Sequence, residues 1–560
     1  MIGMTCITHK NFKKSFKKTR KNINRVNFKT AVIQKTTSIY DTFKVDYNIW
    51  IFIHVYNFGK FLDVCFKSIK EQTFKNVNLV IIDDCSTDNS PKLIKDWAKQ
   101  FESHHVITNK SNKGPGYTKW QSIEYISKTA NKNDIYIILD GDDAFSSNLS
   151  LEIIVNAYIT KKCWMTHGSE DDSSLLKQND YEQIRKKKFK IQHPRTCLCF
   201  LLDYIVKEDF MDRDKKWLLR CTEVAYIFKL IELCGEKNVY NIKDHIYFYR
   251  YQDDNVSNKI SQDYKKDILD FIATSKTYTQ IEEKIHIVMC CYIRHENLKE
   301  IIEKIDNQTV AKRIVFHIVN TNPKKSKWDY IKELITKKGL FKNIEIKICN
   351  TNENLFGYAR FLYVKHLLKS TIVPYVIFID DDMKLKRTWI ENIYKTRAPL
   401  NYMCWYGRIF NKFRDINKFN YNNSISSLMK NFKEPKFDSL KEFEYGGTGG
   451  CIVDTNIFRF DILFRCPDEY RNIEDLWLSF IVKNIIGGKI NVYRDPIILN
   501  QFENESKTAL YKTIGDRKSD FLQMLIKCGF LKVNGFFEKC LNKMVEKDND
   551  SLKSIEKFTF

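Results

Sequence analysis

The chain has 560 residues, of which 43% are hydrophobic, so it is long enough to bury more than one core. It carries 92 Lys and Arg against 69 Asp and Glu, a formal net charge of +23. This balance favours anionic partners such as phosphates or acidic surfaces, although an AT-rich genome explains it equally well. Because no basic-aromatic nucleic-acid module stands out, we expect no specific nucleic-acid partner.

The cysteines and the apolar segments of the sequence indicate in which cellular compartment the protein is expected. The 16 cysteines are scattered and do not form the regular framework of a disulfide-rich secreted domain, which favours a reducing compartment. The Lys-rich segment 1–30 lacks the apolar stretch of a signal peptide, and no apolar run reaches the length of about 18 residues that a membrane helix needs. We therefore expect a cytoplasmic protein whose basic arm is either solvated or in peripheral contact with anionic surfaces.

Strands and helices alternate from the first apolar segment onward. Residues 50–55 predict a strand, the spacing of Leu62, Phe66 and Ile69 predicts a helix, and residues 77–82 predict a second strand. The same alternation continues through further segments: Val106 and Ile107, a helix at 120–127, and the apolar run 135–139. This order predicts a doubly wound α/β domain with a parallel sheet covered on both faces.

Carboxylates follow two of these strands, where ligands bind in such folds. They are Asp83 and Asp84 in VIIDDCSTDNS, and Asp140, Asp142 and Asp143 in IYIILDGDDAF. Two carboxylates one residue apart can share a hard cation, which in turn can bind a diphosphate. Gly141 suits the tight turn between them. The alternative for an isolated Asp-Gly-Asp is an acidic turn that caps the next helix.

The run IFIHVYNFGKFLDVCFKSIKEQTFKNVNLVIIDDCSTDNS resembles the opening of family 2 glycosyltransferases of the GT-A fold. The resemblance continues through NKSNKGPGYTKW, DGDD and HPRTCLCF and spans about residues 48–258. It implies that Tyr56, Asn57 and Asp84 hold the base of a nucleotide-sugar donor. It also implies that Asp140 and Asp142 form the metal-binding DxD motif, with Asp140 close to the donor.

The resemblance suggests two further residues with departures from the family pattern. Glu223 in CTEVAYIFKLIELCG stands where the family has the general base, usually an Asp. The alternative is that Glu223 only faces solvent on a helix whose other face is core. Lys119 is expected among the donor-binding residues, but it stands where many members have Arg, so a bidentate contact to the donor phosphates is not expected of it.

The pattern then repeats at the scale of a domain. The strand in IHIVMCCYIRHENL is followed by a helix, the strand RIVFHIVNTNP and a later strand that ends in Asp380, Asp381 and Asp382. This segment looks like a second GT-A domain with Asp380 and Asp382 as its metal and donor site. Asp475 in NIEDLWLSF resembles the family's ED motif and is the candidate base, with a helix cap as the alternative.

One feature sets the second domain apart. The strand after Arg313 ends in Asn320 and Asn322, so the carboxylate that would bind the donor's base is missing. The second domain is therefore expected to use another donor, to bind it differently, or to hold glycan without catalysis.

The expected fold class is α/β, with two tandem GT-A, Rossmann-like domains. The predicted organisation is a basic arm at 1–45, a first GT-A domain at 46–258, a helical connector at 259–283, a second GT-A domain at 284–504 and a helical tail at 505–560. Below, "first half" and "second half" denote the two predicted domains.

The predicted function is metal-dependent, inverting transfer of a sugar from a UDP- or GDP-sugar to a glycan or glycoprotein, with Mn²⁺ or Mg²⁺ as cofactor and with two active sites. The alternative is one catalytic domain and one GT-A-like module that only binds glycan or nucleotide. A nucleotidyltransferase also uses paired carboxylates but releases pyrophosphate. The Tyr56-Asn57-Phe58-Gly59 turn is a poor match for its glycine-rich basic loop.

Overall fold

The structure is a computed structural model. It describes residues 45–168, 184–186, 191–250, 261–337, 341–410, 421, 424–426, 443–493, 500–501, 515–527 and 558–559. The predicted basic arm, apart from Val45, therefore lies outside the described residues.

The first half is built on a seven-stranded sheet in the order β3-β2-β1-β4-β7-β6-β8. Strands β1 to β4 run parallel, β7 runs antiparallel to β4, and β6 runs antiparallel to β7. The strands are β1 (Ile49–Val55), β2 (Val77–Asp83), β3 (His104–Thr108), β4 (Ile135–Asp140), β6 (Met165–Gly168), β7 (Gln192–Leu198) and β8 (Val239–Asn241).

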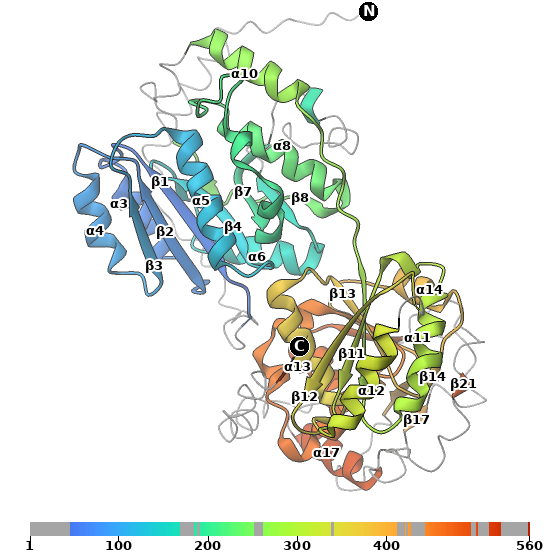
Figure 1. The fold of residues 1–560 in the computed structure, drawn as a ribbon. Coiled ribbons are helices and arrows are strands. Elements are labelled where there is room, and N and C mark those ends of the chain that lie inside the picture. The colour runs from blue at the N-terminus through green and yellow to red at the C-terminus, as the bar shows by residue number, and fades with distance from the viewer. Residues whose placement is uncertain are drawn as a thin grey trace, which may run out of the picture. The chain divides into compact units, whose positions relative to one another are not determined.

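Helices cover both faces of this sheet, as predicted for a doubly wound fold. Helices α3 (Leu62–Lys70) and α4 (Ser90–Ala98) lie on one side and α5 (Pro115–Thr129) on the other (Figure 1). Helix α3 buries Leu62, Phe66 and Ile69, which recur at helical spacing. Helices α6 (Ser150–Lys161) and α8 (Thr222–Cys234) complete the half.

The second half contributes seven strands to an eight-stranded sheet in the order β20-β15-β19-β13-β10-β11-β12-β22, and the predicted tail contributes the eighth, β22. The strands of this sheet are β10 (Ile285–Cys291), β11 (Ile314–Asn320), β12 (Glu345–Thr351), β13 (Tyr375–Ile379), β15 (Asn401–Cys404), β19 (Cys451–Asp454), β20 (Lys489–Val492) and β22 (Phe558–Thr559). The helices of the second half are α11 (Leu298–Asp306), α12 (Lys325–Thr336), α13 (Ala359–Ser370), α14 (Trp389–Lys395) and α15 (Glu474–Phe480).

The two sheets share one topology, so the internal repeat predicted from the sequence is present. Strands β12-β11-β10-β13-β19-β15-β20 follow the same order and directions as β3-β2-β1-β4-β7-β6-β8. Each carboxylate-rich turn also leads into a short strand pair, β5 (Ala144–Phe145) with β9 (Tyr247–Phe248), and β14 (Met383–Lys384) with β21 (Asn500–Gln501). Helix α8 therefore corresponds to α15, and α5 to α13.

The segments outside the two sheets differ in part from expectation. Helix α10 (Gln262–Thr274) occupies the predicted connector, but residues 275–284 form neither helix nor strand. The predicted helical tail contains α17 (Gly515–Lys527) and also β22, which pairs with the edge strand β12. A small sheet consists of β16 (Gly407–Ile409), β17 (Ile425–Ser426) and β18 (Tyr445–Gly446).

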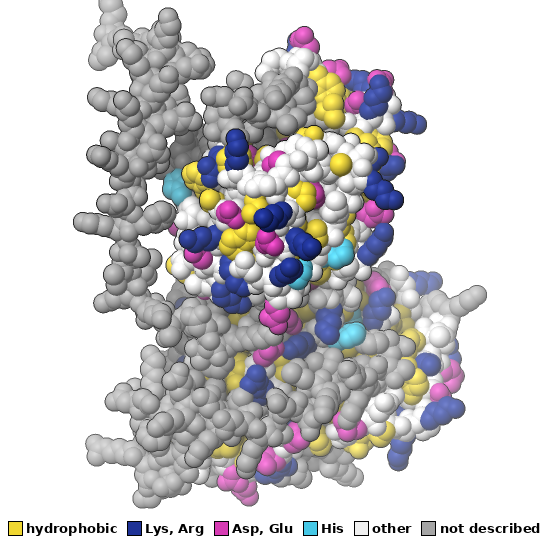
Figure 2. Space-filling view, turned by 90° about the vertical axis from the view of Figure 1, so that its left-hand side faces the viewer, with side chains coloured by type: hydrophobic (Ala, Val, Ile, Leu, Met, Phe, Trp, Pro, Cys, Tyr) yellow, Lys and Arg dark blue, Asp and Glu magenta, His cyan; other side chains and the backbone are white. Residues whose placement is uncertain are grey.

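Two observations concern contact with a membrane: the charges on one face of the molecule and the length of its apolar helices. On the face drawn in Figure 2, Lys and Arg side chains of the described residues are interspersed with Asp and Glu. None of the helices within the described ranges is both long and apolar enough to cross a bilayer.

Candidate active sites

The parallel pairing of β1, β2 and β4 brings the candidate residues of the first half to one edge of the sheet. Val55 is in register with Asp83, and His54 with Asp140. The residues that follow these strands, Tyr56, Asp84 and Asp142, therefore lie at neighbouring strand ends. This is the edge at which a doubly wound sheet binds its ligand.

Asp84 organises the loop that leads into α5. It is 4% exposed, and its carboxylate accepts hydrogen bonds from Asn109 Nδ2 at 2.8 Å and from the backbone N–H groups of Lys113 and Gly114 at 3.0 and 2.8 Å. Gly114 has a φ of +83°, a conformation that glycine adopts without strain. Asp84 thus shapes the wall beside the strand ends, and its contact with the donor's base stays a prediction.

Asn57 has a similar organising position on the neighbouring loop. Its Oδ1 accepts hydrogen bonds from the backbone N–H groups of Thr87 at 2.7 Å and Asp88 at 3.3 Å, and its φ is +57°. Asn tolerates this left-handed conformation better than most residues. The adjacent Tyr56 is partly exposed beside it.

The DGDD turn brings the carboxyl groups of Asp140, Asp142 and Asp143 together at a place that is largely shielded from solvent. Burial and the neighbouring Asp140 raise the pKa of Asp142 to about 6 and that of Asp143 to about 8. Gly141 serves close approach here, because a Cβ at this position would lie 3.1 Å from the His54 carbonyl oxygen. The turn therefore crowds three carboxyl groups at the sheet edge, where burial and mutual repulsion oppose their full ionisation.

Two residues on the segment around β9 hold this turn, and the sequence did not reveal them. Tyr247 donates its hydroxyl proton to Asp143 Oδ2 at 2.7 Å, and the backbone N–H of Arg250 donates to Asp143 Oδ1 at 2.8 Å. The Nε–H of Arg250 donates to the Asp142 carbonyl oxygen at 3.0 Å. They lie about a hundred residues from the turn, and only the pairing of β5 with β9 brings them there.

Glu223 lies in the site and not on a solvent-facing surface, because a buried lysine holds it. Lys119 is 4% exposed, and its Nζ lies 2.9 Å from Glu223 Oε1 and 4.0 Å from Asp140 Oδ1. Burial alone would raise the pKa of Glu223, but Lys119 and Arg195 hold it well below its usual range. Lys119 thus links the two carboxylates that the sequence assigned to metal binding and to acid-base chemistry.

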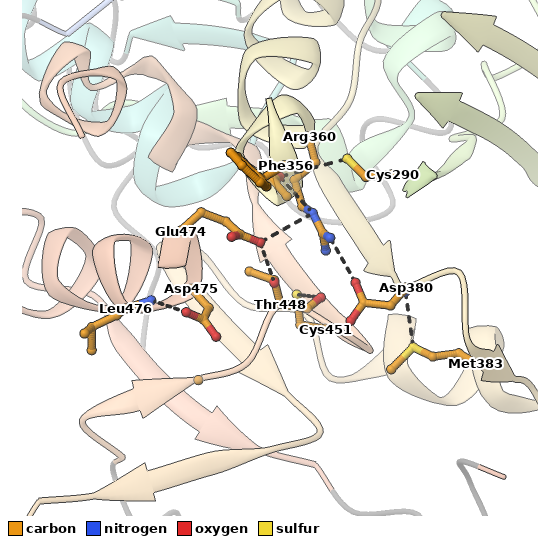
Figure 3. A network of polar contacts seen from close by, with 12 residues as sticks. Cys290, Phe356, Arg360, Asp380, Met383, Thr448, Cys451, Glu474, Asp475 and Leu476 are labelled. Carbon is orange, nitrogen blue, oxygen red and sulfur yellow. Dashed lines mark hydrogen bonds and ion pairs between the residues drawn. The ribbon is translucent and has the colours of Figure 1, made fainter. Parts of the chain in front are cut away.

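In the second half, arginines engage the three carboxylates that follow β13. Arg360 Nη2 lies 2.9 Å from Asp380 Oδ1 and its Nε lies 3.9 Å from Glu474 Oε1, an arrangement visible in Figure 3. Arg294 Nη1 lies 2.9 Å from Asp381 Oδ1 and 2.7 Å from Asp382 Oδ2. Two guanidinium groups therefore offset part of the negative charge at this edge.

The glycine-rich turn at 446–450 closes tightly over this arrangement. A Cβ on Gly449 would lie 2.2 Å from Asp380 Oδ2, so a larger residue at this position would displace the Asp380 carboxylate. Thr448 donates its hydroxyl proton to Glu474 Oε1 at 3.2 Å (Figure 3). Burial raises the pKa of Glu474 to about 7, an effect that Arg360 offsets in part and Asp475 increases.

Asp475, the candidate base, is engaged by side chains from two other elements. The Tyr445 hydroxyl donates to Asp475 Oδ2, and Lys518 Nζ of α17 lies 3.1 Å from the same oxygen. Its Oδ1 accepts a hydrogen bond from the backbone N–H of Leu476 at 2.8 Å. Asp475 is therefore part of a polar cluster in addition to standing in the first turn of α15.

The asparagines at the end of β11 hydrogen-bond with each other and with residues that follow β10. Asn320 Oδ1 lies 2.9 Å from His295 Nε2, and Asn322 Nδ2 donates to the Tyr292 carbonyl oxygen at 2.6 Å. Both asparagines are buried. By register, Asn320 stands at the position of Asp83 and Thr321 at that of Asp84, so neither position carries a carboxylate in the second half.

A divalent cation fits the two carboxylate clusters unequally. Within the described part of the chain, no three His, Cys, Asp or Glu residues are arranged to hold a metal ion. In the first half, burial and then repulsion by Asp140 raise the carboxylate pKa values of the DGDD turn, and a cation at Asp140 and Asp142 would relieve the repulsion. At Asp380 and Asp382 a cation would have to displace arginines, so that arrangement does not fit a metal as it stands.

Comparison with known proteins assigns both halves to one family. The model of "Glycosyl transferase family 2" matches residues 50–203 and again residues 286–464, together more than half of the chain. The chain belongs to glycosyl transferase family 2. With the shared topology of the two sheets, this confirms the prediction of two tandem GT-A domains.

Individual relatives in this family match only part of the chain. It is 29% identical over 101 residues to glycosyltransferase GlyG of Streptococcus pneumoniae serotype 4, which covers 18% of this chain and 32% of that protein. It is 30% identical over 121 residues to an uncharacterized glycosyltransferase of Haemophilus influenzae, which covers 22% of this chain and 46% of that one. The chain thus spans less than half the length of these relatives.

A solved structure is also similar, at lower identity. TarS of S. aureus, residues 1–349 in complex with UDP-GlcNAc, matches with 12% identity and a TM-score of 0.30. The match covers 40% of this chain and 66% of that one.

Proposed function

We propose that this chain transfers a sugar from a nucleotide-diphosphate donor to a hydroxyl group of a glycan or glycoprotein, with inversion at the anomeric carbon. The observation that carries the proposal is the convergence of Asp84, Asp142 and Glu223 at one sheet edge of a family 2 domain. Inversion follows from the family resemblance.

In the first half, Asp140 and Asp142 would hold Mn²⁺ or Mg²⁺, which would neutralise charge on the donor's diphosphate. Asp84 keeps the loop before α5 in place beside the base, through its bonds to the Lys113 and Gly114 N–H groups. Glu223 accepts the proton of the acceptor hydroxyl. Its ion pair with Lys119 keeps the carboxylate ionised and ready to accept, at some cost in basicity.

In the second half, we assign the same proton transfer to Asp475. Glu474 has a partner in Arg360, whereas Asp475 stands at the second position of α15, as Glu223 does in α8. A non-catalytic module that binds nucleotide or glycan is a second candidate for this half. The arginines on Asp380, Asp381 and Asp382 favour it.

The experiment is a screen for nucleoside diphosphate release from UDP-, GDP- and dTDP-sugars with Mn²⁺ and mixed glycan acceptors. Wild type is compared with Asp142→Ala, Asp475→Asn and the double variant, with the exposed Asp96→Ala as control. We expect each single variant to lose one activity and the double variant to lose both. Wild-type turnover in Asp142→Ala and in the double variant would contradict the proposal, and pyrophosphate as product would indicate a nucleotidyltransferase.

A further inference from the structure

The two candidate bases occupy equivalent places and both face a buried lysine. Glu223 and Asp475 are each the second residue of a helix, α8 and α15, that leads from the antiparallel strand to the last strand of its sheet. Lys119 Nζ lies 2.9 Å from Glu223, and Lys518 Nζ lies 3.1 Å from Asp475. The two lysines are only 4% and 8% exposed.

The lysines come from different parts of the fold. Lys119 belongs to α5, where the sequence reads Gly-Tyr-Thr-Lys, and the corresponding start of α13 reads Gly-Tyr-Ala-Arg and ends in Arg360. Arg360 is already engaged by Asp380 and Glu474. The cation that faces the second candidate base is therefore supplied from outside the sheet domain, by α17.

Helix α17 is docked firmly enough to present a side chain with accuracy. Its apolar side chains Phe521, Leu522, Leu525 and Ile526 are all buried. The ring of Phe521 stacks on Tyr470 with centroids 4.1 Å apart and 9° between the planes. This packing against the residues that precede α15 fixes the helix next to the site.

Lys518 meets an aromatic wall as well as the carboxylate. Its Nζ lies 3.3 Å from the Tyr445 hydroxyl oxygen and sits over the rings of Tyr421 and Tyr445 at 5.1 and 5.4 Å. Tyr445 itself donates to Asp475. Such a cation is held by ion pairing and by cation–π attraction together, so the position of its charge is well defined.

We propose that Lys518 is a positioning residue of the second glycosyl-transfer site, and that α17 completes this site by delivering it. The inference rests on the proposed function, in which Asp475 accepts the acceptor's proton. Lys518 and Tyr445 both contact Oδ2 of Asp475. They thereby fix the orientation of this carboxylate toward the acceptor. Lys119 has the same task in the first half.

The test uses the full chain carrying Asp142→Ala, so that only the second half transfers sugar. Lys518→Met and Lys518→Arg are compared in this background, with Asp520→Ala, an exposed residue of the same helix, as control. We expect Lys518→Met to lower kcat by about 10- to 100-fold with donor KM changed less than about threefold, because the lysine faces the base and not the donor. Lys518→Arg should restore most of the loss.

Three results would overturn the inference. One is an unchanged kcat in Lys518→Met. Another is an equal loss in the Met and Arg variants with a matching fall in melting temperature, which would make Lys518 only an anchor of α17. The third is that the Asp142→Ala chain transfers no sugar and that Asp475→Asn has no effect in the wild-type background. This result would refute the function of the second half and this inference with it. If Lys518→Met does not fold, Lys518→Gln is compared with Lys518→Arg by the same criteria.

Discussion

Ionisation of Glu474 should reduce the stability of the second half. Burial raises the pKa of this 7% exposed carboxyl from 4.5 to about 7. Because the folded-state pKa is the higher one, the protonated carboxyl stabilises the fold below about pH 4.5, and this contribution is lost as the pH rises through about 7. At 1.36 kcal/mol per pH unit, the loss amounts to about 3 kcal/mol. Glu474→Gln cannot ionise and should escape it.

Thermal unfolding measured from pH 4 to pH 8 tests this expectation. Glu474→Gln should match wild type near pH 4 and exceed it at pH 8 by roughly 6–10 °C, the equivalent of about 3 kcal/mol in a domain of this size. Glu333→Gln, at a side chain that is 71% exposed, is the control and should follow wild type throughout. Parallel curves for wild type and Glu474→Gln, or a less stable variant at pH 8, would refute the reasoning.

Three further outcomes are expected. Asp84→Asn should lower kcat/KM for the donor by about 10- to 100-fold, since its charged bonds to the Lys113 and Gly114 N–H groups are each worth about 1.5–3 kcal/mol; initial rates equal to wild type would count against it. Phe521→Ala should weaken the docking of α17 by about 3–5 kcal/mol, which amide hydrogen exchange should reveal as faster exchange in α17 and not in α5. In the Asp475→Asn chain, EDTA should stop transfer and Mn²⁺ should restore it; transfer that persists in EDTA would exclude the metal role assigned to Asp140.

The framework of the fold could be predicted because it depends on local sequence. Buried parallel strands are continuous apolar runs, and the predicted segments 50–55, 77–82 and 135–139 fall within β1, β2 and β4. The predicted strands also gave the strand ends, and therefore the positions of Asp84 and Asp142 beside them. The small strands and the order of the antiparallel edge depend on distant pairings, and the sequence pattern alone did not predict them.

The partners of the site residues could not be predicted for the same reason. Lys119 was assigned to the donor, and its burial against Glu223 depends on how α5 meets α8. Arg294 and Lys518 had no assigned role, although both contact candidate site residues. The sequence predicted a helical tail at 505–560 but could not indicate which of its polar side chains would face Asp475.

The common strand order of the two sheets has an evolutionary consequence. Two domains with the same seven-strand order in one chain are most simply explained by duplication of a single ancestral domain, followed by divergence. Divergence is visible at the start of the equivalent helices, where Thr222-Glu223 in one copy corresponds to Glu474-Asp475 in the other. The copy with two acids at this position also takes its lysine from α17, outside the repeated unit. Each copy is thus a natural variant of the other. The two copies allow a comparison, within one molecule, of sites whose lysine comes from different places in the fold.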